Sequence, residues 1–262
     1  MRSVFQSCAG LRCVTSLRPS SIVSAQEPSL WLDPATASPL PDADRIEIWR
    51  TDELPDTFYS AGTPSLTADD LDEINALQHP ILRDRAMRCR ILLRWALSHR
   101  VAETVAPGEW RFTRSANGRL GIIADTRGLD FSISHSGTVS SIAIAWNCSV
   151  GIDLEVETDT VNPLEMVGYL HPREVRGLRM VSATQRPSAF FRLWTLKEAY
   201  SKLLGTGFAA DFSSIAFAID TARLIGSPIR NGGHERMRFS TVRLTQNAVV
   251  HHIALAVGNR SA

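Results

Sequence analysis

Two acidic residues of this chain stand at a spacing that suits phosphate chemistry with a divalent cation. Asp153 and Glu155 lie two positions apart in SVGIDLEVE, residues 149–157, which has the pattern of a strand. Side chains two apart on a strand point to the same face. Adjacent carboxylates repel unless a proton or cation lies between them, and Mg²⁺ takes one or two carboxylates together with waters and phosphate oxygens. The alternative, which this motif taken alone favours, is a solvated acidic face at a strand edge.

The lysines of the chain lie in one short segment. Of 28 Lys and Arg residues only two are lysine, Lys197 and Lys202, which leaves 28 − 2 = 26 arginines. Both lie in WTLKEAYSK, where Glu198 and Lys202 are four apart and Trp194 precedes Glu198 by four. On a helix these three side chains share a face. The pattern fits an ordinary helix ion pair, but lysine is a compact point charge that arginine does not replace, so the segment points to chemistry.

Two further segments are suited to binding phosphate. FSISHS, residues 131–136, is a strand that ends in Ser134 and His135 and is followed by Gly137. Such an end can offer backbone amides, a hydroxyl and an imidazole to a phosphate, or it can be a turn with a structural histidine. The turn from Arg114 to Arg119 carries a cation at each end, which suits either a phosphate or solubility.

These residues must be positioned by a mixture of helices and strands. Apolar periodicity and turn residues predict a helix that begins after Thr67 and a helical pattern through 86–99. Gly205 and Gly207 are expected to end the helix at 188–204. Shorter helices are expected at 163–170 and 172–180, and strands at 45–50, 110–114, 131–134, 140–146, 149–157, 214–219, 236–244 and 251–257. Helices with mainly antiparallel strands predict an α+β fold.

The totals exclude several classes of protein. The 262 residues carry a net charge of +1 and 44% hydrophobic residues, so no overall field favours nucleic acid, and no apolar run is long enough to span a bilayer. The four cysteines lack metal-ligand spacing, which favours a cytoplasmic protein. Residues 1–26 contain arginines and serines but no acid, so an organellar transit peptide is the alternative. The proline-rich segment 27–43 is expected to be a linker.

Together, FSISHS, VGIDLE and WTLKEAYSK resemble the 4′-phosphopantetheinyl transferases of the surfactin-synthetase-activating type. LHPREVRGL, residues 170–178, resembles the helix start between that family's two acidic motifs, and the likeness runs from about residue 45 to 257. The resemblance implies two similar α/β halves with the active site in the cleft between them. The halves are expected at 44–148 and 149–262, after a disordered or targeting extension at 1–43.

The resemblance also implies roles for individual residues. The magnesium ligands would be Asp153, Glu155 and Glu198, and the catalytic residues Glu198 and Lys202. The residues that bind coenzyme A would be Arg88, Arg90, Arg114, Arg119, Ser134, His135, Lys197 and Lys202. The chain departs from the family at Gly118–Arg119–Leu120, where relatives have Gly-Lys-Pro, and at the acidic stretch 67–75, where relatives often have basic residues.

The reaction implied by the resemblance is a Mg²⁺-dependent transfer of 4′-phosphopantetheine from coenzyme A to a serine of an acyl or peptidyl carrier protein. The second product would be adenosine 3′,5′-bisphosphate. The serine proton would go to Glu198 or to a water on the metal. A monomer with no nucleic-acid or membrane partner is expected. The alternatives are a non-catalytic module that binds coenzyme A or a carrier protein, and a metal-dependent nucleotide pyrophosphohydrolase.

Overall fold

The computed structural model describes residues 46–101, 104–123, 128–205, 211–227 and 237–259. The extension predicted at 1–43 lies outside the described residues. The helices are α2 (Asp56–Gly62), α3 (Ala68–Asn75), α4 (Pro80–Arg100), α5 (Pro172–Met180) and α6 (Arg186–Leu204). The strands are β1 (Ile46–Arg50), β2 (Phe112–Arg114), β3 (Leu120–Ile122), β4 (Leu129–Ser136), β5 (Val139–Trp146), β6 (Cys148–Val156), β7 (Ala216–Phe217), β8 (Leu224–Gly226), β9 (Arg238–Gln246) and β10 (Val249–Asn259). Short 3₁₀ turns include η6 (Val167–Tyr169) and η8 (Phe212–Ser214).

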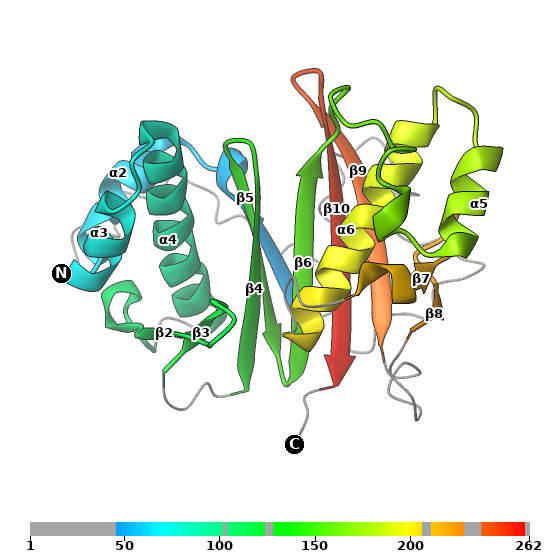
Figure 1. Cartoon of the computed structure of the whole chain (residues 1–262). Coiled ribbons are helices and arrows are strands. Elements are labelled where there is room, and N and C mark those ends of the chain that lie inside the picture. Colours follow the sequence, from blue (N-terminus) through cyan, green and yellow to red (C-terminus); the bar gives the residue numbers. More distant parts are fainter. Residues whose placement is uncertain (1–45, 102–103, 124–127, 206–210, 228–236, 260–262) are drawn as a thin grey trace.

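The first three-stranded sheet is antiparallel, with the strand order β1-β5-β4. The long helix α4 packs beside it (Figure 1) and buries Leu92, Leu93 and Leu97 completely, in a core that includes Phe131 and Ile142 of the sheet. Pro80 begins α4, as its fixed φ favours at the first helical position. The sequence predicted only part of α4, because its first turns are exposed and carry little apolar periodicity.

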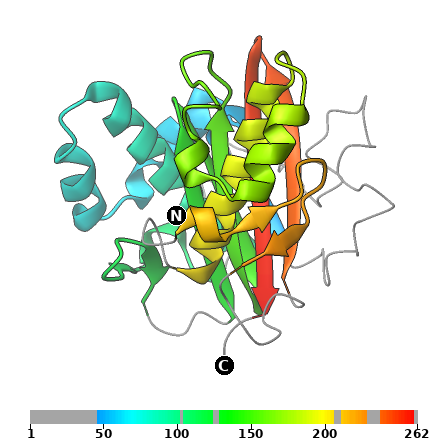
Figure 2. The same cartoon turned by 45° about the vertical axis from the view of Figure 1, so that its right-hand side comes forward.

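The second three-stranded sheet is also antiparallel, with the order β6-β10-β9, and α6 packs against it. Gly151 of β6 explains how closely they approach, because a Cβ at that position would lie 2.0 Å from the carbonyl oxygen of Ala199 in α6. As predicted, α6 ends at Gly205, whose φ of 68° is the left-handed conformation of a helix C-cap. Figure 2 shows α5 and the short strands β7 and β8 lying over the outer side of α6.

Two kinds of contact join the sheets. One is a shared apolar core that includes Ile48 and Ala143 of the first sheet and Ile152 and Leu255 of the second. The other is a seam between β4 and β6, which lie side by side but belong to separate sheets (Figure 1). The connection from β5 to β6 is the single residue Asn147, with a φ of 55°, so the predicted boundary near residue 148 coincides with a tight turn.

The mixed α and β content predicted from the sequence is confirmed, whereas the similarity of two halves, at 44–148 and 149–262, stays a prediction. The helix predicted at 163–170 is wrong in extent, because only the 3₁₀ turn η6 forms there. The strand predicted at 214–219 shortens to β7. Among the described residues, no helix combines the length and the apolar character that crossing a bilayer requires.

Candidate active site

The predicted acidic site lies where β6 meets α6. Asp153 and Glu155 alternate along β6, as expected, and Glu198 is in α6. Asp153 is only 3% exposed. Its Oδ1 accepts hydrogen bonds from the Lys202 ammonium at 2.7 Å and from Ser134 Oγ at 2.8 Å. Burial raises the pKa of Asp153, and the positive charge of Lys202 opposes that rise.

The carboxylates of Asp153, Glu155 and Glu198 act on one another electrostatically. Burial, followed by repulsion from Asp153, raises the pKa of Glu155. Burial and then repulsion from Asp153 raise the pKa of Glu198 to about 7; Lys202 opposes this rise, and Glu155 adds to it. The negative charge of one carboxylate therefore makes its neighbours harder to ionise, and a cation beside them would relieve this repulsion.

The donors at this position fit a magnesium ion. All are oxygens, and Asp153 Oδ2 is buried without a hydrogen-bond partner among the described residues, so a cation beside it would satisfy that oxygen. In the described part of the chain, however, no three His, Cys, Asp or Glu side chains lie close enough together to form a metal-binding group. Mg²⁺ needs only one or two protein carboxylates when waters and phosphate oxygens complete its shell. The ligand set of three carboxylates therefore remains a proposal.

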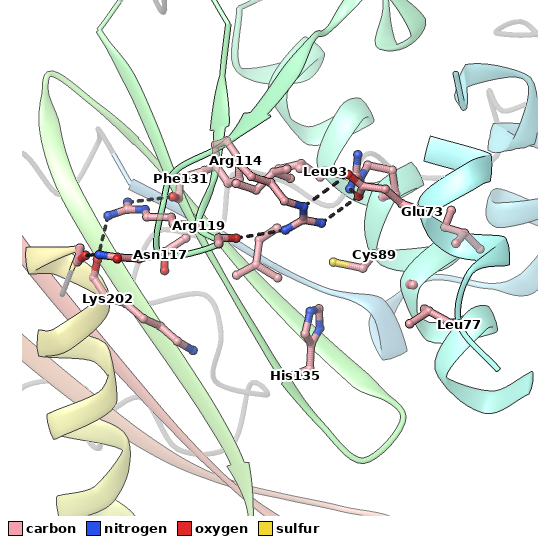
Figure 3. A pocket seen from close by; sticks show the side chains of 18 residues that line it. Glu73, Leu77, Cys89, Leu93, Arg114, Asn117, Arg119, Phe131, His135 and Lys202 are labelled. Atoms are coloured by element: carbon pink, nitrogen blue, oxygen red, sulfur yellow. Dashed lines mark hydrogen bonds and ion pairs between the residues drawn. The ribbon is translucent and has the colours of Figure 1, made fainter. Parts of the chain in front are cut away.

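A cavity of about 620 Å³ opens beside the acidic site. It lies between α3, α4, the β2–β3 hairpin, β4 and the C-terminal end of α6, and Figure 3 shows Lys202 and His135 at its wall. The remaining lining mixes apolar and charged side chains. It includes Ile74, Leu77, Cys89, Leu93, Leu120, Phe131, Glu73, Arg90, Arg114 and Arg119. A cavity of this size, with apolar walls and a few convergent charges, is typical of a small-molecule site.

His135, which was predicted to bind coenzyme A, lines the cavity, and it has a cationic neighbour that was not among the predicted site residues. Its Nδ1 lies 2.8 Å from Ser140 Oγ. Burial by the surrounding protein, and then the positive charges of Arg85 and Lys202, lower the pKa of His135, so the free imidazole is neutral at pH 7. Arg85 itself donates to the Gly137 carbonyl at 2.9 Å. Arg85 comes just before the helical pattern predicted at 86–99, so no periodicity in the sequence singled it out.

Arg90 and Arg114 line the cavity, but each is already paired with an acid. Glu73 of α3 accepts from Arg90 at 2.9 Å and from Arg114 at 2.8 Å, and Arg90 also contacts Asp70. Asp70 in addition binds Arg94 of α4, which is 1% exposed. The acidic stretch 67–75 therefore supplies partners to the arginines of α4 and of the β2–β3 hairpin. This arrangement gives a structural reason for the acidic residues at 67–75, where relatives often have basic ones.

Lys197 does not lie where the resemblance implied. Its side chain is fully buried, and its ammonium is 2.8 Å from a Glu174 carboxylate oxygen of α5. It also donates to the carbonyls of Phe212, at 2.7 Å, and Ile215. The role of Lys197 in binding coenzyme A is corrected: it faces away from the cavity and holds α5 and the segment after α6 against α6.

Two of the predicted arginines and one serine also contact other groups of the protein. Arg88 pairs with Asp84 and Asp56 and does not line the cavity. Arg119 lines it, but its guanidinium is engaged with the carboxylate of Asp130 and the carbonyl of Lys202. The hydroxyl of Ser134 donates to Asp153, as described above, and its predicted contact with coenzyme A stays a prediction. In each case an acceptor of the protein takes the hydrogen bond that was expected to go to coenzyme A.

Comparison with known proteins identifies the family. The model of the 4′-phosphopantetheinyl transferase superfamily matches residues 149–254, which include the acidic site. The chain is 33% identical over 172 residues to 4′-phosphopantetheinyl transferase HetI of Nostoc sp., an alignment that covers 64% of this chain and 71% of that protein. It is 24% identical over 231 residues to a phosphopantetheinyl transferase of Thraustochytrium sp., covering 83% and 78% of the two chains. A shorter alignment to 4′-phosphopantetheinyl transferase gsp of Aneurinibacillus migulanus is 34% identical over 87 residues and covers 33% and 35%. The resemblance seen in the motifs is thus confirmed, and the chain belongs to the 4′-phosphopantetheinyl transferase family of enzymes.

Proposed function

We propose that this protein transfers the 4′-phosphopantetheine group of coenzyme A to a serine hydroxyl of an acyl or peptidyl carrier protein and releases adenosine 3′,5′-bisphosphate. One observation carries the proposal. A buried carboxylate, Asp153, and the lysine bound to it stand beside a cavity whose wall also includes His135. This arrangement can hold a pyrophosphate at the acidic end and a nucleotide in the cavity. Its chemistry is that of phosphoryl transfer, where charge stabilisation and alignment supply most of the rate.

Coenzyme A would lie in the cavity with its phosphates towards positive charge. The Lys202 ammonium, 2.7 Å from Asp153 Oδ1, is placed to stabilise charge on the leaving phosphate. His135 and the neighbouring Arg85 are the candidates for the 3′-phosphate of the nucleotide. A phosphate between them would favour the protonated imidazole, because an adjacent negative charge raises the pKa of histidine.

Asp153, Glu155 and Glu198 would hold the magnesium ion. When bound, Mg²⁺ neutralises phosphoryl oxygens and aligns them for displacement. Glu198 is also assigned to the serine proton, which it accepts directly or through a water. As the hydroxyl oxygen bonds to the β-phosphorus, the bond from that phosphorus to the bridging oxygen breaks, and the bridging oxygen leaves with adenosine 3′,5′-bisphosphate. General-base catalysis of this kind contributes roughly 10²–10⁴-fold. One chain supplies every residue to which a role is assigned, so the proposed reaction needs no second copy, and a monomer stays the prediction.

The test incubates the purified protein with Mg²⁺, coenzyme A and a carrier domain and follows the carrier by mass spectrometry. We expect the carrier to gain the mass of one phosphopantetheine group. Asp153→Ala and Glu198→Ala should abolish the gain, whereas the matched control Asp72→Ala, an exposed acid of α3, should leave it unchanged. Nucleotide release without a mass gain would indicate a pyrophosphohydrolase, and binding without either product would indicate a non-catalytic module.

A further inference from the structure

The seam between β4 and β6 is built from side chains rather than from a backbone ladder. Every second residue of β4 from Asp130 to Ser136 contributes one side chain to it. The backbone N–H of Val150 donates to Asp130 Oδ2 at 2.9 Å, and that of Ile152 donates to Ser132 Oγ at 3.1 Å. These bonds satisfy β6 amides that have no strand partner on this side. The period of two along β4 places the whole row on one face.

The last two members of the row make a further kind of contact. Ser134 Oγ donates to Asp153 Oδ1 at 2.8 Å, and Ser136 Oγ donates to Glu155 Oε2 at 2.9 Å. The Ser136 oxygen also accepts from the N–H of Val156 at 2.9 Å. In the seam, Asp130 and Ser132 accept from the β6 backbone, whereas Ser134 and Ser136 each donate to one of the two carboxylates that we assign to the metal.

These hydroxyls have a physical consequence for the acidic site. A carboxylate that can rotate must be ordered before it binds a cation, and its repulsion from a second carboxylate turns it away. A donor from β4 fixes one oxygen of each carboxylate and offsets part of its charge. In Asp153, both bonded donors are on Oδ1, and Oδ2 remains buried without a partner in the described part of the chain. The orientation thus leaves one oxygen available to a cation.

We propose that Ser134 and Ser136 are positioning residues of the acidic site, and that their hydroxyls on β4 orient the Asp153 and Glu155 carboxylates of β6 for a divalent cation. This inference rests on the proposed function. It also means that the geometry of the site depends on the seam: a shift of β4 along β6 moves both donors away from their carboxylates.

The test compares Ser136→Ala with Ser132→Ala, using Mn²⁺ as the probe and the electron paramagnetic resonance signal of free Mn²⁺ as the readout. Each substitution removes one hydroxyl that accepts from a β6 amide, but only Ser136 also touches a carboxylate. Hydrogen-bond partners of metal ligands typically contribute 10- to 100-fold to metal affinity. We expect Ser136→Ala to weaken Mn²⁺ binding by about tenfold or more and Ser132→Ala by less than about threefold. Ser136→Thr, which keeps the hydroxyl, should restore binding.

The outcomes separate this inference from the function on which it rests. Equal weakening in the Ser136→Ala and Ser132→Ala variants would overturn it, since the hydroxyls would then act only by joining the strands. Wild-type Mn²⁺ affinity in Ser136→Ala, in a protein that modifies its carrier, would overturn the inference and leave the function standing. Selective weakening in a protein that transfers nothing to a carrier would support the inference and remove the proposed function.

Discussion

Replacing Lys197 by methionine tests whether this lysine is structural. Its side chain is fully buried, and the ammonium contacts Glu174 at 2.8 Å and the carbonyl of Phe212 at 2.7 Å, together with a second carbonyl. Lys197→Met keeps most of the apolar length and removes the charge. Glu174 then remains buried without its cation, and two carbonyls lose their donor. Breaking a buried ion pair from one side costs about 3–5 kcal/mol, a large fraction of the 5–15 kcal/mol that roughly spans the stability of a domain.

The assay is urea unfolding followed by tryptophan fluorescence, with Arg176→Met in α5 as an exposed control that should change the free energy of unfolding by less than about 0.5 kcal/mol. The double variant Glu174→Gln with Lys197→Met should be less destabilised than the sum of the single changes, with a coupling of about 0.5–3 kcal/mol. If Lys197 were instead a phosphate contact, Lys197→Met would raise the KM for coenzyme A and change the unfolding free energy by less than about 1 kcal/mol. That pair of results would refute the structural role.

Three further outcomes are expected. Glu73→Gln removes the carboxylate that Arg90 and Arg114 share; Arg90 keeps its contact with Asp70, whereas Arg114 loses its acidic partner. The KM for coenzyme A should therefore fall by about two- to fivefold, the range of partly exposed ion pairs, as measured by steady-state kinetics. Gly151→Ala should destabilise the protein by at least about 2 kcal/mol, because the new methyl group would overlap an α6 carbonyl oxygen 2.0 Å away; a denaturation midpoint equal to that of the wild type would contradict this packing. Burial raises the pKa of Cys89 to about 11 from 9.0, so the folded state keeps this proton when the unfolded chain loses it. Stability from this group should therefore fall as pH rises from about 9 to about 11, more in the wild type than in Cys89→Ala, and iodoacetamide should alkylate Cys89 more slowly than the half-buried Cys148 at pH 8.

Local rules were enough for the elements that carry the chemistry. The period of two in β6 placed Asp153 and Glu155 on one face, and the glycine at 205 marked the end of α6. Helical spacing also separates the two lysines: Lys197 and Lys202 are five positions apart, which is about 140° around the helix at 3.6 residues per turn. Such a separation turns the two side chains towards different surroundings, whereas the resemblance assigned both to the same ligand.

The partners of the charged residues were decided by tertiary packing. Arg90 was predicted to bind coenzyme A. The packing of α3 on α4 brings it into contact with Glu73, which is 17 residues away in the sequence. Arg119 meets the Lys202 carbonyl across a separation of 83 residues. Periodicity and propensity describe neighbours along one element, whereas an ion pair between elements depends on how their faces dock.

By itself, the sequence determined the family, the α+β content and the alternation that aligns the two β6 carboxylates, because each follows from residues close together in the chain. Only the tertiary structure decided that Lys202 rather than Lys197 reaches Asp153, that Arg85 lies beside His135, and that hydroxyls of β4 hold the carboxylates of β6. These contacts join segments far apart in sequence, and they form where burial makes an unpaired charge or polar group costly.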